Sequence, residues 1–193
     1  MINIINELVK IINLLISLFK TGAKKPFISV INQKARKTYP KISHLLTDNK
    51  EYNLKNKIKY FALAYGFKPE LIAGLVGVES GYNNHAQSGA GAFGLMQITR
   101  RWHPLFFNNG SWDNPDYNLN YGCKVLKSYI KFVKSKGVKD SDALKVALAY
   151  YNTGQSAIDS YRAGRNPDET TDFKSYADDV FSYAELIRLQ GVY

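Results

Sequence analysis

The apolar residues of this chain recur mostly at intervals of three and four, the spacing of one face of an α-helix. Residues 2–19 carry a broad apolar face beside a polar stripe with the same spacing, and further helices are predicted over residues 54–65, 69–79, 116–135, 141–152 and 173–189. Residues 80–94 are rich in Gly, Asn and Ser and are predicted to form a loop, with room for a small hairpin within 80–98. No long stretch alternates apolar and polar residues, so the expected fold class is mainly α.

Residues that interrupt or end helices indicate that the chain has two parts. Residues from Thr21 to about Lys50 are irregular and contain Gly22, Pro26 and Pro40, which is typical of a linker. Gly66 is expected to cap one helix and Pro69 to stand in the first turn of the next. We therefore expect an N-terminal amphipathic helix with a linker over residues 1–50 and one folded domain over residues 51–193.

Composition excludes several classes of protein. The chain has 193 residues, of which 45% are hydrophobic and 13% aromatic, too many for an intrinsically disordered chain. Its single cysteine, Cys123, excludes an internal disulfide and shares a predicted apolar helix face with Leu119 and Leu126, which favours a buried position. The three histidines have no zinc-ligand spacing, so neither a metal nor a cofactor is expected.

The formal charge of +10 is confined to one segment. Residues 20–68 hold 12 basic and 2 acidic side chains, whereas the segments on either side are balanced. Such a segment suits an anionic cell-wall polymer, an acidic lipid surface or a nucleic acid, or it merely solvates a linker. Nucleic acid is the least favoured partner, because no zinc-finger, RNA-binding or helix-turn-helix pattern is present.

The first predicted helix allows three interpretations. Its longest uninterrupted apolar run is Leu14–Ile16, which is too short for a membrane span. It also lacks a basic region before the apolar part and a small-residue cleavage site after it, so no signal peptide is expected. The helix could lie on a lipid surface, dock to a virion or secretion partner, or pack on its own domain.

The candidate chemistry centres on Glu79, the last residue of an otherwise apolar predicted helix. Apolar surroundings and the negative end of the helix dipole both disfavour the carboxylate, so its pKa is expected to rise and its proton to remain near neutral pH. An acid of this kind can protonate the leaving oxygen of a glycosidic bond. The alternative is a Glu that simply faces water.

The neighbouring segments have the character of a sugar site. Gly89–Ile98 combines small residues, which let the backbone approach a flat ligand, with the amide of Gln97. Tyr150, Tyr151 and Asn152 end another predicted helix and offer a stacking surface beside an amide. Ordinary core packing remains the alternative for both tyrosines.

Glu79-Ser80, Gly91–Ile98, Ala149–Gly154 and Tyr176 together resemble the four ordered motifs of soluble lytic transglycosylases and goose-type lysozymes. The resemblance covers residues 52–193 and implies a lysozyme-like helical domain that binds peptidoglycan glycan strands. It implies that Glu79 is the catalytic acid, that Ser80 orients it and that Tyr176 contacts its carboxyl group. The substrate-binding residues that it implies are Ser80, Phe93, Gly94, Leu95, Met96, Gln97, His103, Tyr151, Asn152 and Tyr176.

The second carboxylate separates the possible reactions. The resemblance implies aspartates on both sides of the Gly-Leu-Met-Gln segment in goose-type lysozymes, but this chain has Ser88 and Thr99 there. Asp113 and Asp116 come next, in a stretch typical of a turn and helix start. With one carboxylate, Glu79 would give and then take a proton, leaving a 1,6-anhydromuramic acid end. The sequence thus predicts a lytic transglycosylase, with lysozyme-type hydrolysis and a non-catalytic virion or secretion-machine structural protein as alternatives.

These predictions fix an expected place of action. A peptidoglycan substrate puts the protein at the bacterial cell wall, in the periplasm, outside the cell or on a virion. Residues 1–50 would deliver it there, through a membrane surface or a virion or secretion partner.

Overall fold

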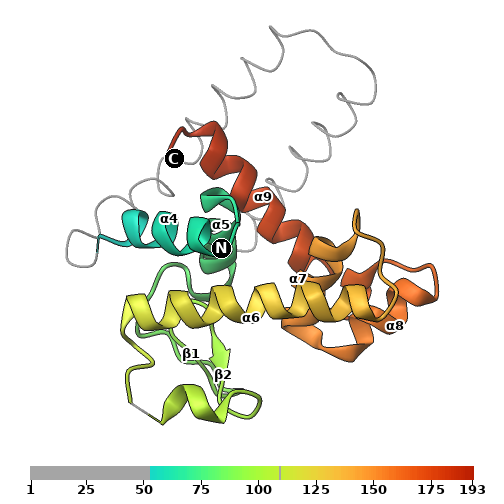
Figure 1. Ribbon diagram of the computed structural model, residues 1–193, viewed down its shortest axis with the longest axis horizontal. Coiled ribbons are helices and arrows are strands. Elements are labelled where there is room, and N and C mark those ends of the chain that lie inside the picture. The colour runs from blue at the N-terminus through green and yellow to red at the C-terminus, as the bar shows by residue number, and fades with distance from the viewer. Residues whose placement is uncertain (1–52, 109) are drawn as a thin grey trace, which may run out of the picture.

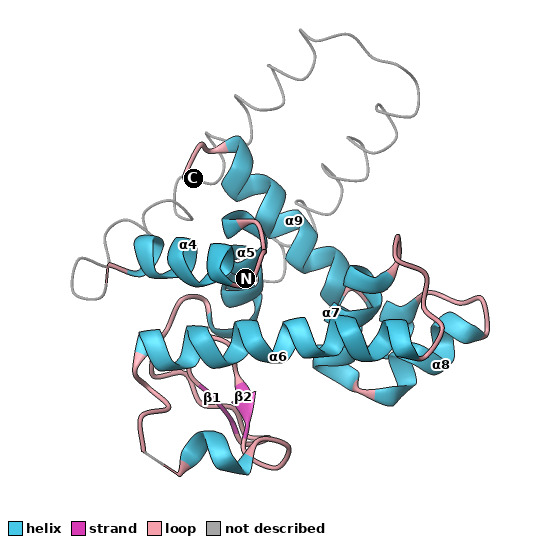
Figure 2. Cartoon of the chain, viewed as in Figure 1, coloured by secondary structure: helices cyan, strands magenta, loops and turns pink. Residues whose placement is uncertain are grey.

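The computed structural model describes residues 53–108 and 110–193 and is mainly helical there, as expected (Figures 1 and 2). The predicted helix over 2–19, the linker and the boundary at residue 50 lie outside the described residues. The elements are α4 (Leu54–Ala64), α5 (Pro69–Ser80), β1 (Ala92–Phe93), β2 (Ile98–Thr99), η1 (Pro104–Phe107), α6 (Pro115–Ser135), α7 (Ala143–Thr153), α8 (Gln155–Arg162), η2 (Pro167–Thr170), η3 (Asp172–Lys174) and α9 (Tyr176–Leu189), where η denotes a 3₁₀ helix.

The long helix α6 crosses the middle of the domain (Figure 1). The two-stranded antiparallel hairpin of β1 and β2, with Ala92 opposite Thr99, lies to one side of it together with η1. At its C-terminal end α6 packs on α7, and α9 then returns across the domain to pack along α5. The chain thereby brings α5, α7 and the start of α9 together, and these three elements carry most of the candidate site.

Local sequence signals set the first two helices. Tyr65 and Gly66 end α4, and Gly66 has the left-handed φ of +76° that a helix-terminating glycine adopts. The N–H of Phe67 donates to the Ala62 carbonyl at 2.8 Å, which satisfies an end group of the helix. Pro69 then opens α5 at its first position. Both expected boundaries are confirmed.

Two later helices differ from the prediction. The short helix α8 was missed because its eight residues include few apolar ones and are fewer than the roughly 11 over which a helical period is recognised. The last helix begins at Tyr176 instead of residue 173, because Phe173 and Lys174 both have left-handed φ values, of 58° and 57°. The expected hairpin is present over residues 92–99 and extends one residue beyond the predicted region.

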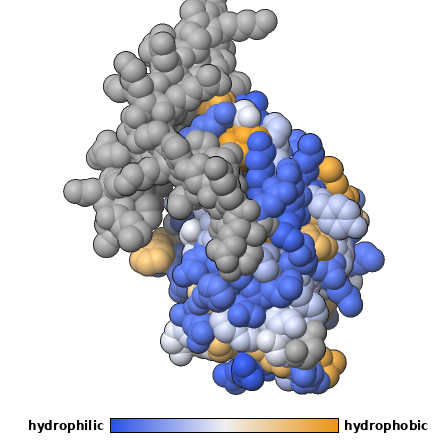
Figure 3. Space-filling view, turned by 90° about the vertical axis from the view of Figure 1, so that its left-hand side faces the viewer, coloured by the Kyte–Doolittle hydropathy of each residue, from blue (hydrophilic) through white to orange (hydrophobic). Residues whose placement is uncertain are grey.

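The surface of the domain is mostly hydrophilic on the face that Figure 3 shows, with scattered apolar residues. Cys123 is fully buried in the core, as expected, and burial raises its pKa to about 12. Within residues 53–108 and 110–193, no individual helix is long and apolar enough to cross a membrane. Only α4 and α5 taken together pass that test, across a bend of 120°.

The packing of α5 on α9 depends on the absence of a side chain at Gly74. A Cβ at this position would lie 2.6 Å from the carbonyl oxygen of Val180 and 2.9 Å from the backbone nitrogen of Ala184. Both contacts are with backbone atoms, which cannot rotate away as the end of a side chain can. The glycine therefore lets the helix that carries Glu79 approach the helix that carries Tyr176.

We expect Gly74→Ala to destabilise the domain by about 1–3 kcal/mol, because the overpacking outweighs the higher helix propensity of alanine, about 1 kcal/mol. Denaturant unfolding followed by circular dichroism measures the change. Gly89→Ala is the control, since nothing lies within 4 Å of a Cβ there, and it should alter stability by less than about 0.5 kcal/mol. Equal stabilities of the two variants would contradict this account.

Candidate active site

Glu79 lies in the last turn of α5, which Gly81 ends with a left-handed φ of 57°. Its side chain is partly accessible to water, although protein surrounds the carboxyl group on most sides. Burial raises the pKa of Glu79 to about 7, and the negative charge of Asp172 acts in the same direction, while a hydrogen bond from Tyr176 lowers it. The net result is a carboxyl group that holds its proton up to neutral pH.

Two tyrosines from different helices lie near this carboxyl group, and one of them contacts it. The Tyr176 hydroxyl, at the start of α9, donates a hydrogen bond to Oε1 of Glu79. The Tyr151 hydroxyl, in the last turns of α7, donates to the Met96 carbonyl oxygen at 2.7 Å. Burial and the charge of Glu79 raise the pKa of both phenols well above the ordinary value, so both remain neutral hydrogen-bond donors.

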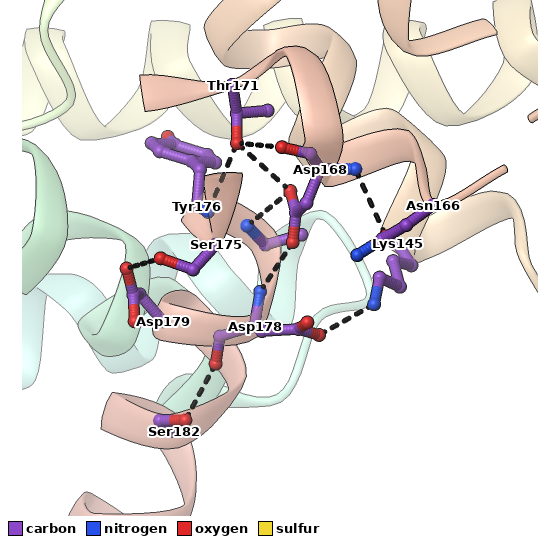
Figure 4. Close-up of polar contacts among 10 residues, drawn as sticks. Lys145, Asn166, Asp168, Thr171, Ser175, Tyr176, Asp178, Asp179 and Ser182 are labelled. Carbon is purple, nitrogen blue, oxygen red and sulfur yellow. Dashed lines mark hydrogen bonds and ion pairs between the residues drawn. The ribbon is translucent and has the colours of Figure 1, made fainter. Parts of the chain in front are cut away.

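A buried carboxylate fixes the start of α9 and thereby the position of Tyr176 (Figure 4). Asp168 is fully buried in η2 and accepts hydrogen bonds from the backbone N–H groups of Ala177, at 2.9 Å, and Asp178, at 3.1 Å. These N–H groups have no partner within the helix, and a negative charge at a helix N-terminus is favourable. The Tyr176 N–H donates to the Thr171 hydroxyl at 3.3 Å, so the backbone of the tyrosine is held on both sides.

The segment after β1 is held in place by a single side chain of α6. Asn118 is fully buried, and its amide group donates to the carbonyls of Phe93 and Trp112, at 3.2 and 3.0 Å. Its oxygen accepts the N–H of Met96 at 2.9 Å. A Cβ at Gly94 would lie 2.1 Å from the Asn118 amide nitrogen, so only glycine fits at this point of the loop.

The predicted lining residues of this segment take up different positions. Leu95 and Met96 have fully buried side chains in the core, so only their backbone atoms can face a ligand. The ring of Phe93 packs edge-on against Phe107 and Trp112. The side-chain amide of Gln97 donates within the loop, to the carbonyls of Gly94 at 2.9 Å and Ala86 at 3.2 Å.

Two other predicted residues bond to groups other than Glu79. The Ser80 hydroxyl donates to the Val76 carbonyl one turn back in α5, at 3.1 Å. The two ring nitrogens of His103 lie 3.3 Å from the Tyr121 hydroxyl and 3.2 Å from the Tyr129 hydroxyl, and burial lowers the pKa of the imidazole, which favours its neutral form.

Tyr129 connects this histidine to α7. Its ring centroid lies 4.9 Å from that of Tyr150 and 5.9 Å from that of Tyr151, with both pairs edge-to-face. His103 and Tyr151 thus belong to one aromatic cluster. The hydroxyl groups of Tyr121, Tyr129 and Tyr151 are held in place there by hydrogen bonds.

Asn152 pairs with an acid that the sequence analysis did not single out. Its side-chain oxygen accepts the backbone N–H of Asp172 at 3.0 Å, and its amide nitrogen donates to Oδ2 of Asp172 at 3.3 Å. Asp172 is exposed, and its charge acts on Glu79. The structure therefore brings Glu79, Tyr176, Tyr151 and Asn152 into one region and adds Asp172 to them.

Three residues that position or influence the candidate site escaped the sequence analysis, and the signals that could have revealed them differ. Asn118 precedes Leu119 in the apolar part of its predicted helix. A polar residue at a position expected to be in the core indicates a buried hydrogen-bonding role. Asp168 follows Pro167 shortly before the last helix, a pattern typical of capping. Asp172 has no local signal, because its role depends on chain segments that only folding brings together.

No group of three His, Cys, Asp or Glu side chains suited to hold a metal occurs in the described part of the chain.

The sequence of this chain was compared with models of known protein families and with known proteins, and the results agree on one family. A family model described as "Transglycosylase SLT domain" matches residues 56–173. The chain belongs to this family.

The relatives of this SLT domain include goose-type lysozymes and membrane-bound lytic transglycosylases. Lysozyme g of Takifugu rubripes is 31% identical over 157 residues, covering 75% of this chain and 80% of the relative. Lysozyme g of Gallus gallus is 28% identical over 140 residues, covering 69% and 63%. Membrane-bound lytic murein transglycosylase C of Actinobacillus pleuropneumoniae serotype 5b (strain L20) is 31% identical over 111 residues, which is 52% of this chain and 30% of that protein. The resemblance found in the sequence is confirmed.

The neighbours of Glu79 in this SLT domain should shift its pKa in opposite directions. Tyr176→Phe removes a donor that favours the carboxylate, so the pKa of Glu79 should rise above about 7. Asp172→Asn removes a nearby negative charge, so the pKa should fall. Titration of the Glu79 carboxyl carbon by NMR in both variants measures the shifts, and equal or same-signed shifts would contradict the assignment of causes.

Proposed function

We propose that this chain is a peptidoglycan lytic transglycosylase that cleaves the β-1,4 bond between N-acetylmuramic acid and N-acetylglucosamine and leaves a 1,6-anhydromuramic acid end. Its membership of the SLT family and its relatives make it a peptidoglycan-cleaving enzyme. The observation that carries cleavage is Glu79, a carboxyl group with a pKa of about 7 that Tyr176 holds in place. The choice of reaction rests on Ser88 and Thr99, which stand where goose-type lysozymes are expected to have aspartates.

In the first step, Glu79 protonates the glycosidic oxygen as the bond from that oxygen to the muramic acid C1 breaks. A group must carry its proton at working pH to do so, and burial supplies that condition here. The substrate's own N-acetyl group would stabilise the positive charge that develops at C1. N-acetylglucosamine leaves with a new hydroxyl group.

In the second step, the C6 hydroxyl of the same muramic acid attacks C1 and gives its proton to the Glu79 carboxylate. The acid is thereby restored, and no water is consumed. Since one group is acid and then base, a pKa near the working pH suits both steps. The Tyr176 hydroxyl donates to Glu79 Oε1 and leaves Oε2 for the proton transfers.

Lysozyme-type hydrolysis is the second candidate, and Asp172 is the observation that favours it. An inverting hydrolase needs a carboxylate about 6.5–9.5 Å from the acid to activate water. Asp113 lies 3.6 Å from His85 and Asp116 is ion-paired with Lys57, so each has its own partner. The charge of Asp172 raises the pKa of Glu79, but the Asp172 carboxylate also accepts a hydrogen bond from the Asn152 amide. This hydrogen bond favours a positioning role for Asp172 over the activation of water.

The remaining site residues are proposed to bind the glycan. The Asn152 amide and the hydroxyl of Tyr151 would orient the sugar next to the scissile bond, while His103 would contact a neighbouring sugar ring. Phe93, Gly94, Leu95, Met96 and Gln97 would contribute mainly through the loop backbone, because Gly94 has no side chain and the other four side chains are engaged within the protein. Ser80 would act on Glu79 only through the α5 backbone.

The place of action follows from the substrate. Relatives named as a membrane-bound transglycosylase and as lysozymes support action at the cell wall, in the periplasm or outside the cell. We propose that residues 1–50 deliver the domain there through a membrane surface or a virion or secretion partner. Their excess of Lys over acidic residues suits an anionic surface.

Mass spectrometry of peptidoglycan digested by the full chain should find muramic acid ends that are lighter than hydrolysed ends by one water, about 18 mass units. Glu79→Gln keeps the size of the side chain but removes the titrating proton, and it should lower the rate by at least about 100-fold. Asp172→Asn should still give the lighter ends.

Two results would contradict this proposal in different ways. Hydrolysed ends alone, lost in the Asp172→Asn variant, would establish a lysozyme with Asp172 as base. Full activity of the Glu79→Gln variant would remove Glu79 from the reaction altogether.

A further inference from the structure

We propose that Phe173 is a stacking platform for a sugar ring of the glycan strand, at the rim of the site that Glu79 and Asn152 define. This inference rests on the proposed function, since it names a binding contact of the same site. Pyranose rings present apolar C–H faces, and an exposed aromatic ring can cover such a face. The ligand class is therefore a β-1,4-linked N-acetylated amino sugar.

The exposure of Phe173 is extreme for an aromatic residue. Its side chain is 95% exposed. The next most exposed large apolar side chains of the described residues are Leu105 at 75% and Tyr60 and Trp102, both at 68%. Exposing an apolar side chain of this size forgoes the stabilisation that burial would give. At this exposure the ring contributes almost nothing to the packing of the domain and is accessible to a ligand.

The position of Phe173 in the chain ties it to the site. The preceding residue, Asp172, exchanges two hydrogen bonds with Asn152, and Tyr176, three residues later, donates to Glu79. Consecutive Cα atoms lie about 3.8 Å apart, so Phe173 cannot leave this neighbourhood. Its ring is thus carried on a turn whose two ends both contact site residues.

The turn itself is held in an unfavourable conformation. Phe173 and Lys174 have φ values of 58° and 57°, in the left-handed region that residues other than glycine rarely adopt. Thr171 anchors the turn, since its hydroxyl donates to the Asp168 carbonyl at 2.8 Å and accepts the Tyr176 N–H (Figure 4). The fold maintains this conformation, and its result is the outward-facing ring of Phe173.

Binding of a soluble hexamer of β-1,4-linked N-acetylglucosamine, measured by calorimetry, tests this inference. All proteins are full-length and carry Glu79→Gln, so the sugar is not cut. Phe173→Ala should raise Kd about three- to tenfold, and Phe173→Trp should restore binding and change its fluorescence when the sugar is added. Tyr60→Ala, which removes a 68% exposed aromatic residue on α4, is the matched control and should leave Kd unchanged.

Phe173→Gly separates binding from structure. Glycine adopts the left-handed conformation without strain, so the melting temperature should stay the same or rise while Kd rises as in the alanine variant. A fall in melting temperature together with the loss of binding would assign Phe173 a structural role and overturn the inference.

The remaining outcomes distinguish this inference from the proposed function. If the Glu79→Gln protein binds the hexamer and Phe173→Ala leaves Kd unchanged, the inference is wrong and the proposed function stands. If the Glu79→Gln protein binds neither the hexamer nor sedimented peptidoglycan, both are wrong.

Discussion

The hydrogen bond from Tyr176 to Glu79 joins two residues that are 97 positions apart in the sequence, and the site exists only where their helices meet. Two features let α5 and α9 approach closely enough for this hydrogen bond to form. Gly74 lets the backbones of α5 and α9 approach, and buried Asp168 fixes where α9 begins by accepting its first free N–H groups. Asn118 performs the corresponding task for the loop that accepts the Tyr151 hydroxyl. Buried polar side chains that are hydrogen-bonded thus position the candidate catalytic group, Glu79, and the segments around it.

The protonation of Glu79 links the site to stability. Its pKa is about 7 in the folded chain and 4.5 as a free group, so the folded state binds more protons between these values. Stability therefore decreases as the pH rises through this window, by at most about 3 kcal/mol once the group is ionised. A typical domain has only about 5–15 kcal/mol in total. The site keeps its acid because the surrounding helices supply enough packing energy to tolerate this loss.

Local patterns predicted the parts of the fold that local physics determines. Gly66 and Pro69 mark helix ends through their backbone preferences, and the apolar run before Glu79 already indicates that its carboxyl group is buried. Predictions failed where partners are distant in sequence. The Asn152 amide meets Asp172 across a turn whose left-handed residues no propensity predicts, and that turn also displaced the expected start of the last helix.

The two candidate reactions place different demands on the pKa values of their carboxyl groups. A hydrolase with separate acid and base works best when one carboxyl group is protonated and the other ionised, so their pKa values must differ. A single group that gives and then takes the same proton needs a pKa near the working pH, since either extreme slows one of the two steps. Burial and the charge of Asp172 move Glu79 toward that value, and the Tyr176 hydroxyl keeps it from rising further. In the proposed one-carboxylate reaction, Asp172 would act only through the effect of its charge on the pKa of Glu79, while Asn152 holds Asp172 in place.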